Sequence, residues 1–441
     1  MTSLARKRIL IAGGMIFILT TLAFVHWRTR RSVQGSLTRS RTTFASFITY
    51  ETPCASAADP DVAAGPELFG VTIQRPAYFY DKKTGALDHE FSWEACRGRF
   101  VSDTHIVFDR SSQRWFITTV LDLGQQGHHQ GVQVMVSTDA SAREWKCSVP
   151  VDMPRMIDNP EPTVTSDKVV ITTDECIWVV DKRALIAGNA PVVQPSVCDL
   201  AHNNQVAATK YGGDPPATAY AITMSDHTHL NWVSTEGPAA TAKVTQHSLE
   251  VPFVDEVKAI TQEGKSELQS AGDQPFWQND HLIWNLTVRC PTGACVRSFD
   301  VNTATNTVTS DDFAMEGTQL FNGASGFDSH GNKWLLMSAA KPSGFVGLAL
   351  AGRLASGQII QPEQIVEGRA YIDDPVSLSL FGLIERKSPR EHPTIRFGDY
   401  VEAAQDPIDG TVWFMGMYAA GKGPLNRESG AGCMAVRINP Q

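Results

Sequence analysis

The sequence predicts an all-β fold, a seven-bladed β-propeller, from three observations. Gly, Pro, Asp and Asn interrupt the chain about every ten residues, and helical periodicity is weak beyond the N-terminus. An aspartate precedes a tryptophan by six residues across a polar turn at Asp109 and Trp115, and again at Asp328 and Trp334. A third such hairpin lies near the C-terminus. A hairpin unit that recurs at blade-like spacing is typical of propellers.

The C-terminal hairpin is the clearest, in the stretch 396–418. A short strand over Tyr400–Ala404 is followed by Asp406-Pro407 and Asp409-Gly410. These pairs favour a turn because proline presets φ and glycine accepts a positive φ. The residues after the turn are β-branched and aromatic and include Trp413, which predicts the second strand.

Seven units of this kind follow one another, each with strand-like runs separated by turn residues. They span residues 62–93, 103–149, 160–198, 204–252, 273–309, 322–366 and 396–439. A six-bladed ring is the alternative, because the fourth and fifth units lack a clear Asp-to-Trp turn. A strand from the N-terminal side that joined the last blade would remove the open sheet edge.

Residues 1–31 are predicted to form an N-terminal signal anchor. The run 9–27 holds nineteen residues without a charge, enough to cross a bilayer as a transmembrane helix, and no cleavage signal closes it. Residues 32–60 are rich in Ser, Thr and Ala and are predicted to be a juxtamembrane linker. The propeller is then expected over 61–441, with the membrane as a partner of the helix alone.

The charge distribution argues against nucleic acid as a partner. Eight of the 38 lysines and arginines precede Glu51, the first acidic residue, so the other 30 face 47 acids and give a formal charge of −17. Such a body repels a phosphate backbone. The basic stretch 28–41 is expected either to touch lipid head groups or to form a solvated linker.

The eight cysteines indicate the compartment. Cys290 and Cys295 are predicted to pair across a four-residue hairpin turn, and Cys176 with Cys198 because they flank one blade-sized segment. Disulfides require an oxidising setting, which places the propeller outside the cytoplasm and the N-terminus inside. Free buried thiols are the alternative.

Several phrases resemble a group of secreted bacterial β-propeller proteins. They are Asp61-Val-Ala-Ala-Gly-Pro66, Phe108-Asp-Arg with Trp115, Ser137-Thr-Asp139 with Trp145, Asp181-Lys-Arg, and the Gly398-Asp-Tyr turn. Members have sialidase-like or YVTN-like blades and are mostly uncharacterised. The resemblance covers most of 60–441 and implies the fold and an extracytoplasmic place, but it transfers no catalytic residue.

A candidate ligand-binding set lies where each innermost strand is expected to begin, because those positions converge around the propeller axis. The set comprises Asp103, Asp158, Asn204, Asp273, Asn322 and Asp399, with Arg396 as the one nearby cation. Such oxygen ligands could hold a hard cation such as Ca²⁺ or hydrogen-bond sugar hydroxyls. The alternatives are that these residues simply form turns and that Arg396 neutralises Asp399.

Three functions remain open. The first is a membrane-anchored module that binds a glycan, polymer or protein ligand, and it is favoured because no catalytic signature is present. The second is a glycan-acting enzyme, either a sialidase-like hydrolase or a polysaccharide lyase, since many aspartates are available. The third is an envelope assembly scaffold. The sequence identifies no cofactor.

Overall fold

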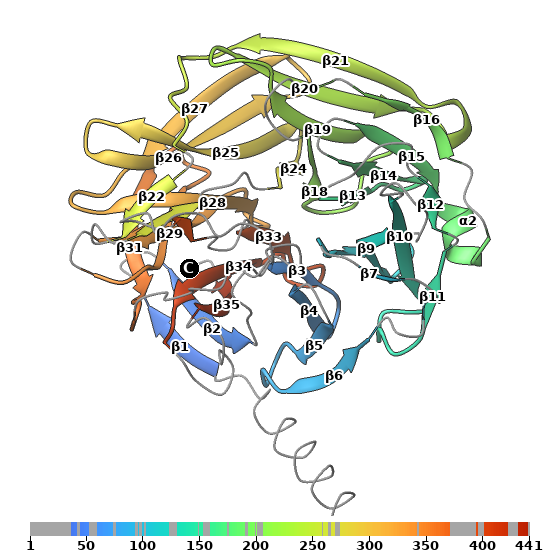
Figure 1. Ribbon diagram of the computed structural model, residues 1–441, viewed down its shortest axis with the longest axis horizontal. Coiled ribbons are helices and arrows are strands. Elements are labelled where there is room, and N and C mark those ends of the chain that lie inside the picture. Colours follow the sequence, from blue (N-terminus) through green and yellow to red (C-terminus); the bar gives the residue numbers. More distant parts are fainter. Residues whose placement is uncertain are drawn as a thin grey trace, which may run out of the picture.

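The computed structural model is a ring of seven β-sheets, so the predicted seven-bladed propeller is confirmed. The strands follow one another around the ring in chain order (Figure 1). The structure describes residues 37–41, 45–52, 60–73, 76–92, 96, 99–100, 103–122, 130–148, 150–152, 159–173, 176–189, 193–198, 200, 206–257, 259–262, 266–269, 274–341, 344–370, 394–395, 401–421 and 431–439.

The first four blades match the predicted units closely. Blade 1 holds β3 (Pro60–Ala64), β4 (Leu68–Ile73), β5 (Ala77–Asp81) and β6 (Leu87–Phe91). Blade 2 holds β8 (His105–Asp109), β9 (Arg114–Asp122), β10 (Gln130–Ser137) and β11 (Trp145–Cys147), with β7 (Arg99–Phe100) and β12 (Val151–Asp152) beside them. Blade 3 holds β13 (Glu161–Val164), β14 (Lys168–Thr172), β15 (Ile177–Asp181), helix α2 (Lys182–Ala187) and β16 (Val193–Val197). Blade 4 holds β17 (Ala207–Ala208), β19 (Ala219–Met224), β20 (His229–Glu236), the short helix η2 (Ala239–Thr241) and β21 (Lys243–Glu250).

The last three blades complete the ring. Blade 5 holds β24 (Phe276–Gln278), β25 (His281–Cys290), β26 (Gly293–Asn302) and β27 (Thr307–Phe313), with β18 (Lys210–Tyr211) parallel to β24. Blade 6 holds β28 (Gln319–Phe327), β29 (Lys333–Ala340), β30 (Gly347–Arg353) and β31 (Ile359–Val366). Blade 7 holds β33 (Glu402–Gln405), β34 (Val412–Ala419) and β35 (Ala431–Asn439). A small separate sheet contains β22 (Ala259–Gln262), β23 (Ser266–Gln269) and β32 (Thr394–Ile395).

The ring is closed by strands from the N-terminal side of the chain. Strand β2 (Ser46–Thr52) pairs antiparallel with β35, and β1 (Leu37–Arg41) covers β2 as the outermost strand of blade 7. In Figure 1 these blue strands lie against the red ones. The linker predicted over 32–60 is therefore corrected in part, because β2 buries side chains such as Phe47 and Tyr50 in the core.

The predicted transmembrane helix over 9–27 lies outside the described residues, as do residues 1–36 in general. Within the described part of the chain, no helix has the length and apolar character needed to span a bilayer. The anchor and the orientation of the chain across a membrane therefore stay predictions.

The Asp-to-Trp hairpins prove to be structural. Asp328 accepts a hydrogen bond from Trp334 Nε1 at 2.9 Å, and Asp406 accepts one from Trp413 Nε1 at 3.1 Å. The tryptophan on each second strand thus buries its ring in the core while the aspartate satisfies its N–H. Trp115 differs, because its Nε1 donates to the carbonyl of Ala140 at 2.9 Å.

Asp109 does not accept a hydrogen bond from Trp115 and forms an ion pair with a lysine of the next blade. Lys182 of blade 3 lies 2.7 Å from the Asp109 carboxylate and also donates to Ser111 Oγ at 2.7 Å. Blade 1 repeats the arrangement, since Lys82 contacts Asp406 of blade 7 at 2.8 Å. Both lysines directly follow the aspartate that ends the third strand of their blade. A buried Lys–Asp pair therefore crosses two of the blade interfaces.

Three disulfides join described residues. Cys176–Cys198 and Cys290–Cys295 are both present, as the sequence predicts, and Cys96–Cys147 adds a third. The β25–β26 turn is tighter than expected, because Cys290 lies opposite Gly293 in the hairpin register and the bridge runs diagonally. Cys433 is also disulfide-bonded, and Cys54 lies outside the described residues.

Replacing Lys182 with Met tests the importance of these inter-blade pairs. The substitution leaves the buried Asp109 carboxylate without its cation, so the free energy of unfolding should fall by about 3–5 kcal/mol in a urea titration. Arg183→Met, at the neighbouring exposed position, is the matched control and should change stability by less than about 0.5 kcal/mol. Equal stability of the two variants would show that the ion pair does not hold the blades together.

Candidate functional site

Charged side chains from several blades meet at the propeller axis. Asp61 comes from β3, His105 from β8, Glu161 from β13, Lys210 from β18 and Glu402 from β33. All five are buried. Innermost strands of different blades approach one another only around the axis, so these five residues define an axial cluster.

Lys210 is the centre of one half of the axial cluster. Its ammonium forms an ion pair with Asp61 Oδ1, donates to the carbonyl of Val62 at 3.1 Å and lies 3.4 Å from Glu402 Oε2. Asp61 also accepts a hydrogen bond from the backbone N–H of Ile106 at 2.8 Å. The ion pair and its hydrogen bonds therefore connect blade 1, blade 2 and strand β18 of blade 5.

His105 connects this half to Glu161. Its Nδ1 lies 3.5 Å from Asp61 Oδ2, and its Nε2 donates to Asn159 Oδ1 at 2.5 Å. Asn159 in turn donates to Glu161 Oε1 at 2.7 Å, and the N–H of Ala208 donates to Glu161 Oε2 at 2.7 Å. Since both ring nitrogens face acceptors, the geometry favours a protonated imidazolium.

Burial and charge act against each other in this cluster. Burial alone would raise the pKa of Asp61 and lower the pKa of Lys210, but their mutual attraction reverses both directions. Burial would also lower the pKa of His105, yet the hydrogen bond and charge of Asp61 raise it to about 9.

Burial has the larger effect on the other two carboxyl groups of the axial cluster. Burial raises the pKa of Glu402 to about 8, and the charges of Asp61 and Glu161 add to the effect while Lys210 opposes it. Burial likewise raises the pKa of Glu161 to about 7, against the charge of His105. Neither carboxyl oxygen of Glu402 accepts a hydrogen bond from the residues the structure describes. At neutral pH Glu402 is therefore largely a neutral acid.

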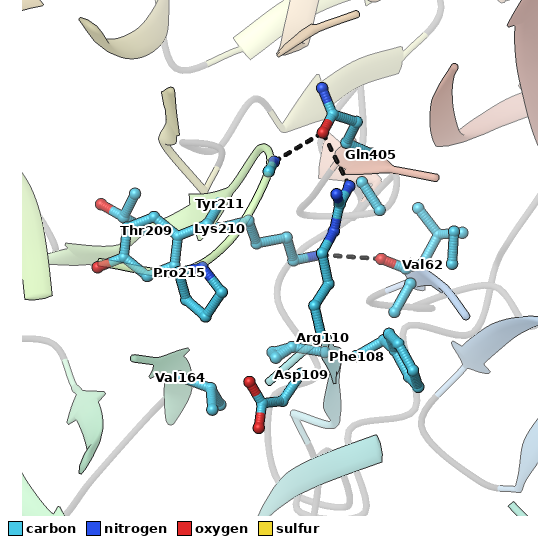
Figure 2. A pocket seen from close by; sticks show the side chains of 15 residues that line it. Val62, Phe108, Asp109, Arg110, Val164, Thr209, Lys210, Tyr211, Pro215 and Gln405 are labelled. Carbon is cyan, nitrogen blue, oxygen red and sulfur yellow. Dashed lines mark hydrogen bonds between the residues drawn. The ribbon is translucent and has the colours of Figure 1, made fainter. Parts of the chain in front are cut away.

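A pocket opens at the carboxyl ends of the innermost strands, with Lys210 in its lining (Figure 2). Its cavity measures about 50 Å³. Its lining includes Asp109, Arg110, Lys210, Gly213 and Gln405. We call this the axial pocket. Since one water needs roughly 10–15 Å³, the axial pocket has room for one functional group and not for a whole sugar ring.

Arg110 is the side chain of the axial pocket with unused hydrogen-bonding capacity. Its Nη2 donates to Gln405 Oε1 at 2.8 Å and to the carbonyl of Asp406 at 3.0 Å, both neutral acceptors. The N–H of Gly213 donates to the same Gln405 oxygen at 2.7 Å. Among the described residues, Nε and Nη1 of Arg110 have no hydrogen-bond acceptor. Burial lowers the pKa of Arg110, and the charges of Asp214 and Asp406 oppose this effect without a direct ion pair. Asp109 is already held by Lys182.

Two of the seven predicted ligand-binding residues, Asp103 and Asn322, are among the residues the structure describes. Asp103 precedes β8 as expected and is buried with a φ of 53°. Asn322 is a correction, because it lies inside β28 at a bulge with a φ of 45°, three residues after that strand begins. Neither residue lines the axial pocket. The remaining five, Asp158, Asn204, Asp273, Arg396 and Asp399, lie outside the described residues, so their role stays a prediction.

The Ca²⁺ hypothesis gains no support from the described residues, which contain no group of three or more His, Cys, Asp or Glu arranged to hold a metal ion. Sequence reasoning missed the axial cluster, although a signal existed. Asp61, His105, Glu161 and Glu402 each stand at or next to the start of an innermost strand.

Comparisons with known proteins find only distant likenesses among solved structures. No family model matches the chain, and no curated protein matches its sequence. A hypothetical selenium-binding protein from Sulfolobus tokodaii is similar over 76% of this chain and 91% of its own, at 10% identity and a TM-score of 0.46. The periplasmic gluconolactonase of Pseudomonas aeruginosa is similar over 76% of this chain and 96% of its own, at 12% identity and a TM-score of 0.44. A quinonprotein alcohol dehydrogenase-like protein from Bacteroides thetaiotaomicron is similar over 77% and 78%, at 10% identity and a TM-score of 0.44.

The raised pKa of Glu402 and His105 predicts that stability falls as the pH rises. Stabilisation from a group whose pKa is raised on folding is complete below its unfolded pKa and is lost as the pH passes the folded value. For Glu402 this window runs from 4.5 to about 8, and for His105 from 6.5 to about 9. Urea titrations should show a loss of at most about 1.4 kcal/mol per pH unit for each group.

Glu402→Gln should flatten this dependence below pH 8, and the exposed Glu67→Gln should leave it unchanged. A wild-type stability that rises through this range, or an identical slope in Glu402→Gln, would contradict the protonation states assigned here.

Proposed function

We propose that the protein is an extracytoplasmic binding module that receives a carboxylate group of its ligand in the axial pocket. The observation that carries this proposal is Arg110, a half-buried guanidinium whose hydrogen-bond acceptors among the described residues are all neutral. A guanidinium offers a planar pair of donors that matches a carboxylate, and this charge-assisted contact is stronger than a neutral hydrogen bond.

The size and charge of the axial pocket support the same ligand class. Lys210 is neutralised by Asp61, and Asp109 by Lys182, which leaves Arg110 as the net charge of the lining. A cavity of about 50 Å³ admits a carboxylate but leaves the rest of the ligand on the propeller face. An acidic glycan or an acidic side chain of a protein would fit, and an uncharged polymer would not satisfy Arg110.

The proposed place of action rests on the disulfides. Three bridges among the described residues favour an oxidising compartment, and an uncleaved anchor over 9–27 would hold the propeller at the outer side of a membrane. Two further points stay hypotheses. One is that the blades are sialidase-like or YVTN-like, and the other is that the protein is an envelope assembly scaffold.

Arg110→Gln tests the proposal with acidic sugars as probes. Galacturonate, glucuronate and N-acetylneuraminate should bind the wild-type chain in calorimetry, and the substitution should weaken binding by about ten- to a hundredfold because a charged hydrogen bond is lost. Arg289→Gln, which removes an exposed arginine paired with Asp255, is the matched control and should bind normally. No binding by the wild-type chain, or equal binding by Arg110→Gln, would overturn the proposal.

A second function, acid catalysis on a glycan, is favoured by one observation. Burial raises the pKa of Glu402 to about 8. Glu402 is fully buried and does not line the axial pocket itself, but it lies 3.4 Å from Lys210, which does. A general acid needs a raised pKa of this kind. Turnover of a panel of fluorogenic glycosides that is abolished in Glu402→Gln, while the variant stays folded, would establish catalysis. A panel that the wild-type chain leaves intact would leave binding as the function.

A further inference from the structure

A second hollow lies between blades 5 and 6, on the same side of the ring as the axial pocket. It has a volume of about 370 Å³, within the range of small-molecule sites. The turns β24–β25, β28–β29 and β30–β31 form its walls. Its polar lining residues are Gln278, Asn279, His281, Asp300, Lys333 and Arg353, and Phe327 contributes an aromatic ring. We call this the interblade groove.

Lys333 is buried in this lining with weak hydrogen bonds. Its side chain is 3% exposed, and its ammonium lies 3.4 Å from both Ser298 Oγ and Asp311 Oδ2, at the outer limit for a hydrogen bond. Asp311 is mainly engaged by Arg353, whose Nε donates to it at 2.8 Å. Burial lowers the pKa of Lys333, against the charges of Asp300 and Asp311. An acceptor supplied by a ligand would complete the bonding of this lysine.

His281 and Asp300 add a partly exposed donor–acceptor pair. Nδ1 of His281 lies 2.8 Å from Asp300 Oδ1, with 44% and 21% of the two side chains exposed. Within the described residues, His281 Nε2 and Asp300 Oδ2 have no further hydrogen-bond partner. The same holds for the exposed amide of Asn279, which stands in the turn with a φ of 50°. These residues therefore offer both hydrogen-bond donors and acceptors to a ligand in the groove.

We propose that the interblade groove binds a neutral polyhydroxylated ligand, such as a sugar unit. The formal charges around it cancel, since Lys333 and Arg353 face Asp300 and Asp311, so a strongly anionic ligand gains nothing from entering. Sugar hydroxyls act as both donors and acceptors and match the mixture of amide, imidazole, carboxylate and ammonium groups. The ring of Phe327, which meets His281 edge-on with centroids 6.2 Å apart, supplies an apolar contact for a sugar face.

The interblade groove and the axial pocket are joined by a hydrogen bond between their linings. Gln405 of the axial pocket donates through Nε2 to Gln278 Oε1 of the groove at 2.8 Å. A line of polar side chains thus runs from Arg110 through Gln405 and Gln278 to the groove. This deepens the proposed function, on which it rests: the ligand would be a glycan with an acidic residue at Arg110 and a neutral residue in the groove.

The test uses neutral sugars, which do not need Arg110. Cellobiose, maltose, lactose and N-acetylglucosamine are titrated onto the full chain and followed by saturation-transfer difference NMR. At least one should bind saturably. Asp300→Asn and Asn279→Gly should each weaken that binding about tenfold. The first replaces an acceptor oxygen with a donor and removes the charge, the second removes the side-chain amide, and glycine keeps the positive φ of position 279.

Asp226→Asn is the matched control. It alters a similar Asp–His pair, with His229 Nδ1 at 2.9 Å, on an exposed turn of blade 4, and it should leave sugar binding unchanged. No saturable signal from any of the four sugars, or full binding by Asp300→Asn and Asn279→Gly, would overturn the groove proposal while leaving the axial pocket standing. Loss of binding in Arg110→Gln alone would place the sugar in the axial pocket and equally overturn it.

Discussion

The ion pair between Lys210 and Asp61 is the interaction on which the centre of the propeller depends. Removing two charges from water costs several kcal/mol per ion, which close contact alone does not repay. Here the Val62 carbonyl and the Ile106 N–H complete the hydrogen bonding of the pair. Because the partners come from different parts of the ring, folding of the individual blades cannot form this pair before the ring assembles.

The same pair determines the protonation of its neighbours. Asp61 keeps its negative charge and so holds the proton on His105, while the charge of Asp61 helps to keep Glu402 neutral. The axial cluster therefore both stabilises the centre of the ring and determines the protonation states of its own members. Hydrophobic contacts between blades are not directional, and the buried Lys–Asp pairs at Asp109 and Asp406 add the directional contacts that fix one blade against the next.

Much of the fold could be predicted from the sequence because strand and turn signals are local. Asp406-Pro407 and Asp409-Gly410 sit in the turn between β33 and β34, as their φ preferences require. The closing strands β1 and β2 were harder to predict, since their Ser- and Thr-rich sequence also suits a linker. They form strands through long-range pairing, because β2 pairs with β35 and β1 pairs with β2.

The site could be predicted only in part. Convergence at the axis follows from the fold, but which end of the strands opens depends on side-chain packing, and Asp103 lies away from the pocket. The sequence around Arg110 does not predict a binding role. The neighbouring Asp109 could neutralise Arg110, but it is paired with Lys182, which lies 73 positions after Asp109 in the chain. The charge balance of the interblade groove likewise depends on contacts between separate blades.

A double-mutant cycle on Lys210 and Asp61 tests the central claim most directly. Lys210→Met and Asp61→Leu should each lower the free energy of unfolding by about 3–5 kcal/mol, because each leaves a buried charge without its partner. The double variant should be more stable than either single one, with a coupling energy above about 1.5 kcal/mol. Single losses that simply add in the double variant would show that the two residues act independently, and the account of the axial cluster would then be wrong.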